Sequence, residues 1–185
     1  PNMTIVAPCD AEEMRRFMNA SLHWPDPIYI RLAKGGDSVV SRPEHKFEIG
    51  KAIMLREPGR VLFVSTGVMT QRALDASDKL EQKGIPAGVL HFHTIKPFDR
   101  DALLSSITGV DLVITVEEHT LIGGLGSLVL ETLNAERHSG ITKVIRLGFP
   151  DEFAPEYGSQ DSLLDKWGLN GDVLADRAIS ELTSG

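Results

Sequence analysis

The sequence is poor in the features that mark secreted or membrane proteins. Its 185 residues include one cysteine, Cys9, so no internal disulfide can form and a reducing compartment is favoured. No apolar run approaches the ~18 residues that a membrane-spanning helix needs, and no stretch resembles a signal peptide. A net charge of -7 argues against nucleic acid or an anionic membrane as the main partner. The composition therefore predicts a soluble cytoplasmic protein.

Familiar catalytic and nucleotide-binding motifs are also missing. The sequence has no Ser-His-Asp ordering, no Walker loop and no cysteine pair. The glycine cluster Gly123-Gly124-Leu125-Gly126 lacks the G-x-G-x-x-G spacing, and no acidic residue is obviously placed to bind a ribose. We therefore favour a structural interpretation over nucleotide binding: these glycines allow a tight turn and close packing of a helix.

Alternating strand and helix patterns define the fold that we expect. A hydrophobic fraction of 42% over 185 residues suffices for one core plus a small extra piece. The class is α/β: a three-layer αβα open sheet, mostly parallel, with about five strands, and a small strand-helix-strand piece at the amino terminus. Strands are expected at about 3–7, 28–32, 47–56, 61–64, 87–91, 112–116 and 141–147. Helices are expected at about 11–22, 69–82 and 97–107, from Ser127 onward, and within 163–182.

A polar stretch divides the chain into two parts. Residues 36–46 read as a linker between a piece at 1–35 and a domain at 47–185. The first piece is too small to bury a core by itself, so we expect it to lie apart from the main sheet or against a neighbouring chain. Because the chain opens almost directly with a strand, we also expect it to be a fragment of something larger.

The centre of the chain runs from an apolar strand, 112–116, into three polar residues and the glycine turn. Glu117, Glu118 and His119 follow the strand, at the end where α/β proteins place their sites. An acid-base or metal cluster is one interpretation. Consecutive side chains of an extended chain point to opposite faces, however, so the three cannot easily meet on one atom. We favour a hydrogen-bonding role at a domain or subunit boundary.

Two basic residues are the best candidates for binding an anion. Arg31 and Lys34 follow the apolar strand at 28–30, and Gly35-Gly36 comes next. A guanidinium matches the geometry of phosphate and carboxylate, although a solvated surface arginine is an equally good interpretation. His91 and His93 have the spacing of one strand face and, with Lys96, could line a polar crevice. Without a third ligand they are weak evidence for a metal.

Several of these motifs together resemble a known family. The run VITVEEH-x-x-x-GGLGS, preceded by HTIKPFD and VLFVSTG, is similar to the carboxyl-terminal domain of the transketolase superfamily. The opening MTIVAPCDAEEM and PIYIRLAKGG is similar to the end of the pyrimidine-binding domain that comes before it. The resemblance covers nearly the whole chain. It is strongest to the carboxyl-terminal subunit of split, two-subunit transketolases.

The resemblance implies a thiamine diphosphate enzyme with a divalent ion, Mg²⁺, that transfers two-carbon ketol units between sugar phosphates. The partners implied are a second copy in a homodimer, a companion amino-terminal subunit, or both. The family's cofactor-activating glutamate and G-D-G metal motif lie elsewhere, so this chain alone is expected to bind no cofactor and to be inactive. Arg31 stands at the family's substrate-phosphate arginine, and Lys34 at the neighbouring basic position.

The family's carboxyl-terminal domain serves chiefly in dimerisation and scaffolding. The resemblance therefore implies a structural or interface role for Glu118, His119, Gly123, Gly124 and Gly126. Two alternatives remain open within the superfamily. One is the beta subunit of a 2-oxoacid dehydrogenase first component, which docks a partner acyltransferase. The other is part of a deoxyxylulose-phosphate synthase.

Overall fold

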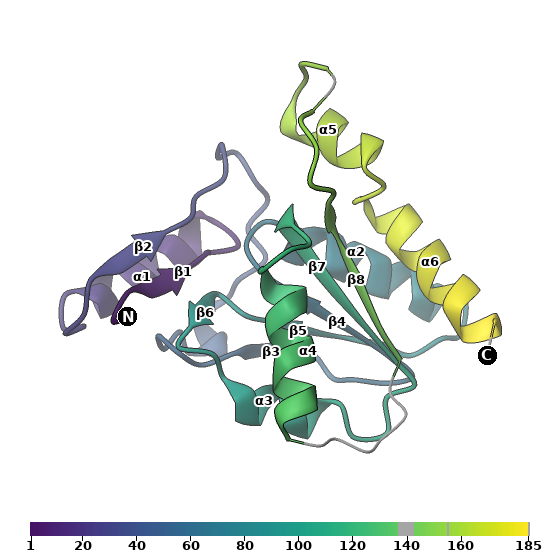
Figure 1. Ribbon diagram of the computed structural model, residues 1–185, viewed down its shortest axis with the longest axis horizontal. Coiled ribbons are helices and arrows are strands. Elements are labelled where there is room, and N and C mark those ends of the chain that lie inside the picture. Colours follow the sequence, from purple (N-terminus) through teal and green to yellow (C-terminus); the bar gives the residue numbers. More distant parts are fainter. Residues whose placement is uncertain (137–142, 155, 185) are drawn as a thin grey trace.

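A five-stranded sheet forms the body of the protein in the computed structural model, which describes residues 1–136, 143–154 and 156–184 (Figure 1). Its strands lie in the order β3-β5-β4-β7-β8. All neighbouring pairs are parallel except β3 and β5, which are antiparallel. The strands are β3 (Ile53–Arg56), β4 (Val61–Ser65), β5 (Ala87–His91), β7 (Leu112–Thr120) and β8 (Lys143–Phe149). The predicted mostly parallel sheet of about five strands is confirmed.

Helices cover both faces of this sheet because its central strands are apolar on both sides. Val61 and Phe63 of β4 pack into one core, and Leu62 and Val64 pack into a second core on the opposite face. The first core is closed by α2 (Met69–Gln82), α5 (Gln160–Lys166) and α6 (Gly171–Thr183). The second is closed by α3 (Arg100–Ser106) and α4 (Leu125–Ala135). The three layers of the predicted αβα architecture are confirmed.

The amino-terminal strand-helix-strand piece forms a second, smaller sheet. β1 (Thr4–Val6) and β2 (Ile28–Ile30) are parallel and are joined through α1 (Ala11–Ser21). A third strand, β6 (Thr94–Lys96), comes from the segment after β5 and pairs antiparallel with β1. Figure 1 shows this purple piece beside the carboxyl ends of the central strands. The two parts are thus tied together by a strand that sequence patterns did not reveal.

The segment expected to be a linker is held against α1. Asp10 caps α1 by accepting a hydrogen bond from the Glu13 N–H at 2.8 Å. Its other carboxylate oxygen accepts from the N–H groups of Val40 and Ser41, at 2.8 and 2.7 Å. A short 3-10 turn (Pro43–His45) follows. These bonds fix the path of the chain from the small sheet to the large one.

Several element boundaries differ from expectation. Strand β7 continues to Thr120, where the sequence pattern ended it at Val116, because β8 remains beside it as far as the Thr120–Phe149 pair. Strand β3 spans Ile53–Arg56 instead of 47–56, and α4 begins two residues before Ser127. The predicted start of the last strand, at 141–142, lies outside the described residues. Among the described residues, no helix is both long and apolar enough to cross a membrane.

Candidate functional site

A crevice of about 210 Å³ lies where the two sheets meet. In the chain β4 is followed by β5 and β7 by β8, and these two strands lie on opposite sides of the β4–β7 pair. The connections therefore diverge at the carboxyl ends of β4 and β7. Open α/β sheets bind ligands at such a switch point. The main sheet contributes the residues just after β4, the end of β7 and the turn before α4, and the small sheet covers them. Of the residues singled out from sequence, the crevice is lined by Arg31, Glu117, Glu118, His119, Gly123 and Gly124.

Arg31 bridges the two sheets. It follows β2, its side chain is exposed, and its guanidinium donates a hydrogen bond to the main-chain carbonyl of Glu118 in β7. A guanidinium has five N–H donors, so this bond leaves donors for a ligand in the crevice. Lys34 is also exposed and lines a neighbouring cavity of about 550 Å³ to which Arg31 contributes. The predicted pair therefore shares this neighbouring cavity, and of the two only Arg31 also lines the crevice.

Glu117 is buried beneath the crevice and caps α4. Its carboxylate accepts hydrogen bonds from the N–H groups of Leu125 at 2.6 Å and Gly126 at 2.8 Å. Both groups belong to the first turn of the helix, whose N–H groups lack partners within the helix. Burial raises the pKa of Glu117, and the two amide donors oppose this increase. The residue acts as an internal helix cap.

The glycine turn is shaped around this carboxylate. Gly123 has a φ of +74°, which favours glycine. A Cβ on Gly124 would overlap the Glu117 carboxylate, with the carboxyl carbon at 2.7 Å, and a Cβ on Gly126 would lie 2.7 Å from the Thr115 hydroxyl. The geometry agrees with a tight turn and close helix packing.

Glu118 and His119 have separate partners. The Glu118 carboxylate accepts a hydrogen bond from Gln160 at 2.6 Å. His119 donates from Nδ1 to the main-chain carbonyl of Thr120 at 2.8 Å, and the same nitrogen lies 4.0 Å from Glu117 Oε2. The strand alternation places Glu117 and His119 on one side and Glu118 on the other. The three side chains do not form one cluster.

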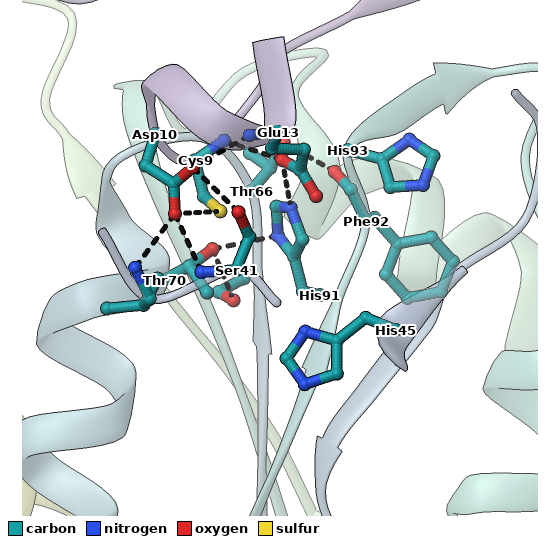
Figure 2. Close-up of polar contacts among 12 residues, drawn as sticks. Cys9, Asp10, Glu13, Ser41, His45, Thr66, Thr70, His91, Phe92 and His93 are labelled. Atoms are coloured by element: carbon teal, nitrogen blue, oxygen red, sulfur yellow. Dashed lines mark hydrogen bonds and ion pairs between the residues drawn. The ribbon is translucent and has the colours of Figure 1, made fainter. Parts of the chain in front are cut away.

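A second polar group lies inside the protein, between α1 and β5 (Figure 2). His91 Nε2 is 2.9 Å from Glu13 Oε2, and His91 Nδ1 is 2.8 Å from the Thr70 hydroxyl. The same Glu13 oxygen accepts the Cys9 N–H at 2.7 Å. Burial is the largest single influence and acts to raise the pKa of Glu13, but His91, His93 and the Cys9 N–H together outweigh it and the pKa falls to about 2. Sequence reasoning connected neither Cys9, Glu13 nor Thr70 with His91.

The prediction that His91, His93 and Lys96 could together line a polar crevice is wrong. Both histidines are fully buried, whereas Lys96 is exposed. The ring of His93 stacks on Phe47 at a centroid distance of 4.1 Å, and burial lowers its pKa to about 4. Asp10 and Glu13 have the spacing of a capping box, S/T/D-x-x-E. Asp10 caps α1, but Glu13 reaches Cys9 and His91 instead of the Asp10 N–H.

The fold and the crevice define a three-layer α/β domain that forms its site together with a second sheet. The family model of the transketolase carboxyl-terminal domain matches residues 50–174. The chain belongs to the transketolase family, and the resemblance of its motifs to that family is confirmed.

Relatives align with almost all of this chain. It is 40% identical over 174 residues to the transketolase family protein y4mN of Sinorhizobium fredii, covering 92% of this chain and 49% of that protein. It is 36% identical over 186 residues to the 1-deoxy-D-xylulose-5-phosphate synthase of Methylacidiphilum infernorum, covering 98% of this chain and 29% of the synthase. The chain thus spans about half the length, or less, of these curated relatives.

A solved structure extends the likeness to three dimensions. A split-gene transketolase, described as an inactive beta4 tetramer, superposes with a TM-score of 0.89 at 36% identity. The alignment covers 99% of this chain and 59% of that one. Transketolase from Campylobacter jejuni, at 18% identity and a TM-score of 0.65, shares the fold.

Proposed function

We propose that this chain is the carboxyl-terminal part of a thiamine diphosphate-dependent transketolase-type enzyme, which moves ketol units between sugar phosphates in the cytoplasm. The observation that carries the proposal is the 36% identity to the split-gene transketolase, with a TM-score of 0.89 over 99% of this chain. In this proposal residues 47–185 are the carboxyl-terminal domain, 36–46 the linker, and 1–35 the end of the preceding pyrimidine-binding domain. The domain serves in dimerisation and scaffolding, and a companion amino-terminal subunit completes the enzyme.

Arg31 is the residue that we assign to the substrate. It lines the crevice where the small sheet meets the main sheet. Its hydrogen bond to the Glu118 carbonyl orients the guanidinium without neutralising the charge. A phosphate or carboxylate of the substrate would accept the remaining N–H donors. Lys34 adds a second positive charge on the neighbouring rim. Glu118, His119 and the three glycines keep a structural role in this proposal.

The described residues of the crevice do not fit the cofactor itself. A divalent ion holding a diphosphate needs carboxylate oxygens that are free to coordinate it. Here both oxygens of the Glu117 carboxylate accept amide N–H groups and Glu118 Oε1 accepts from Gln160, so of these two carboxylates only one oxygen is left, too few to hold the ion. We therefore assign thiamine diphosphate and Mg²⁺ to the rest of the enzyme and derive no catalytic step from these 185 residues.

Reconstitution tests the proposal. The longer protein that contains this chain is mixed with its companion amino-terminal subunit, thiamine diphosphate and Mg²⁺, with a pentose phosphate as the ketol donor. We expect ketol transfer from the mixture and none from the 185 residues alone, which should also bind no thiamine diphosphate in calorimetry. Ketol transfer by the 185 residues alone, or a correctly folded mixture that transfers no ketol group to any sugar phosphate, would contradict the proposal.

A second candidate activity is supported by the synthase relatives. Identity to the Methylacidiphilum infernorum synthase is 36%, in the same range as to the split-gene transketolase. The same reconstituted enzyme separates the two candidates by its product. Formation of 1-deoxy-D-xylulose 5-phosphate, without exchange of ketol groups between sugar phosphates, would favour the synthase.

A further inference from the structure

Three potential metal ligands converge where α1 meets β5. They are Cys9 Sγ, a carboxylate oxygen of Glu13 and a ring nitrogen of His91, and all three atoms lie within 4.8 Å of one another. Cys9 and Glu13 flank the start of α1, whereas His91 ends β5, so the group joins segments that are about 80 residues apart. Figure 2 shows the three side chains turned toward one another. Cys9 is 1% exposed, and Glu13 and His91 are 0% exposed.

The Glu13 carboxylate has an unfilled position. Its Oε2 accepts two contacts, from the Cys9 N–H and the His91 ring, but its Oε1 has no hydrogen-bond partner among the described residues. An ionised carboxylate oxygen that is removed from water without a partner is costly, and folded proteins rarely leave one. The Cys9 thiol lies 3.6 Å from Asp10 Oδ2, a long contact, and also interacts with the Glu13 carboxylate. Glu13 Oε1 and Cys9 Sγ are therefore buried atoms that remain available as metal ligands.

The surroundings hold the histidine in the orientation that a metal requires. Metal-binding histidines use their second ring nitrogen for a hydrogen bond that fixes the ring. His91 Nδ1 lies 2.8 Å from the Thr70 hydroxyl, and that hydroxyl lies 3.0 Å from the Ser65 hydroxyl. With a metal on Nε2, Nδ1–H donates to Thr70, which in turn donates to Ser65. This chain of hydroxyls accommodates the required tautomer without any rearrangement of the backbone.

Solvent also comes close to one side of the group. A surface cavity of about 200 Å³ is lined by Cys9 and Asp10, together with Met14 of α1 and Gly35 and Gly36 of the loop after β2. The two glycines have φ values of +93° and +91°, and a Cβ at either position would meet open space. This cavity brings solvent next to Cys9, the member of the group nearest the surface, whereas Glu13 and His91 do not line it.

We propose that Cys9, Glu13 and His91 form a binding site for a divalent transition-metal ion of the zinc class. Thiolate and imidazole ligands with one carboxylate suit Zn²⁺, whereas Mg²⁺ and Ca²⁺ prefer oxygen ligands alone. Ligands of a tetrahedral zinc lie ~3.3–3.8 Å apart, so shifts of about 1 Å or less bring the three ligand atoms, now within 4.8 Å of one another, into that geometry. Glu13 Oε1 or a water fills the fourth position.

Binding has a balanced proton count. Burial, with the neighbouring Glu13 and Asp10 carboxylates, raises the pKa of the Cys9 thiol, so the thiol is protonated in the metal-free protein. The ion replaces that proton: an S–Zn bond forms as the S–H bond breaks, and the thiol proton leaves to solvent. The His91 ring proton that faces Glu13 from Nε2 also leaves that nitrogen and is carried by Nδ1 instead, where it donates to Thr70. The bound ion joins the small sheet to the main sheet, so its role is structural. The site is independent of the proposed ketol transfer.

Cobalt substitution tests the site directly. The purified 185-residue protein is loaded with CoCl₂ or ZnCl₂, dialysed, and analysed for bound metal and for absorption. We expect about one equivalent of metal and, for cobalt, the charge-transfer absorption of a thiolate ligand. Because Cys9 is the only cysteine in the sequence, this band identifies the ligand without any substitution. We also expect zinc to raise the melting temperature.

Substitutions provide the matched comparison. Cys9→Ser should abolish the charge-transfer band, and both Cys9→Ser and Glu13→Gln should weaken zinc binding at least tenfold. His45→Asn, a histidine near the group but outside it, should bind metal as the wild type does. Retention of no metal by the folded wild type, a cobalt complex without the thiolate band, or unchanged binding by Cys9→Ser would each overturn the proposal.

Discussion

Replacement of Glu117 by glutamine tests how the crevice is built. The amide keeps the shape of the side chain and one acceptor oxygen, but its NH₂ group must face either the Leu125 or the Gly126 N–H, which now has no acceptor. A buried N–H without a partner costs about 1–3 kcal/mol. We therefore expect Glu117→Gln to lower the free energy of unfolding by about 1–3 kcal/mol.

Urea unfolding at pH 7 and 25 °C measures this difference, with an unchanged m value expected if the native and unfolded states keep their compactness. Glu118→Gln is the matched control, because the adjacent side chain lies on the other side of β7 and its amide oxygen can still accept from Gln160. The control should change stability by about 0.5 kcal/mol or less. If Glu117→Gln is no more destabilising than Glu118→Gln, the capping argument is wrong.

The dependence on pH has a definite sign. Because burial raises the folded-state pKa of Glu117 above its ordinary value of 4.5, the native state binds the proton more tightly than the unfolded state. The resulting stabilisation is complete below pH 4.5 and is lost as the pH rises through the folded-state pKa. Glutamine does not titrate. The difference in unfolding free energy between wild type and Glu117→Gln should therefore be larger at pH 4.5 than at pH 7, and the opposite trend would refute this account.

Three other substitutions test the fold and the proposed site. Asp10→Asn should lower the unfolding free energy in urea by about 2 kcal/mol, because an amide N–H₂ would face the Ser41 N–H that now donates at 2.7 Å; an effect below about 0.5 kcal/mol would contradict this. Gly88→Ala should cost about 3 kcal/mol in the same assay, because its Cβ would lie 2.5 Å from Pro58 Cα; wild-type stability would show that the backbone yields easily. In the reassembled enzyme, Arg31→Ala should raise KM for phosphorylated substrates about tenfold or more and affect unphosphorylated donors much less, with partial rescue by lysine. Equal effects on both substrates would make Arg31 a structural residue.

The sequence alone determined the order and type of the main elements. The helix predicted at 69–82 begins at Met69 and ends at Gln82, and the buried runs around Val61 and Ala87 are strands. These elements were predictable because periodicity and glycine or proline boundaries are local properties of the chain. The motif resemblance was equally local, and it predicted the family correctly.

Only the tertiary structure decided which side chains meet. Arg31 and the Glu118 carbonyl are 87 residues apart, and Glu13 and His91 are 78 apart, so no local pattern could have paired them. The pairing of β6 with β1 is similarly remote. Sequence patterns gave the faces on which side chains lie, but they carried no information on how the small sheet packs against the large one.

Glu117 shows the physical reason for this division. Its position at the end of an apolar strand was evident from the sequence, and alternation correctly separated it from Glu118. Whether its carboxylate would bind a ligand or cap a helix depended on where the first turn of α4 would lie, eight or nine residues further on. Secondary structure follows from short-range backbone preferences, whereas the partner of a buried charge is set by long-range packing, which exists only once the chain is folded.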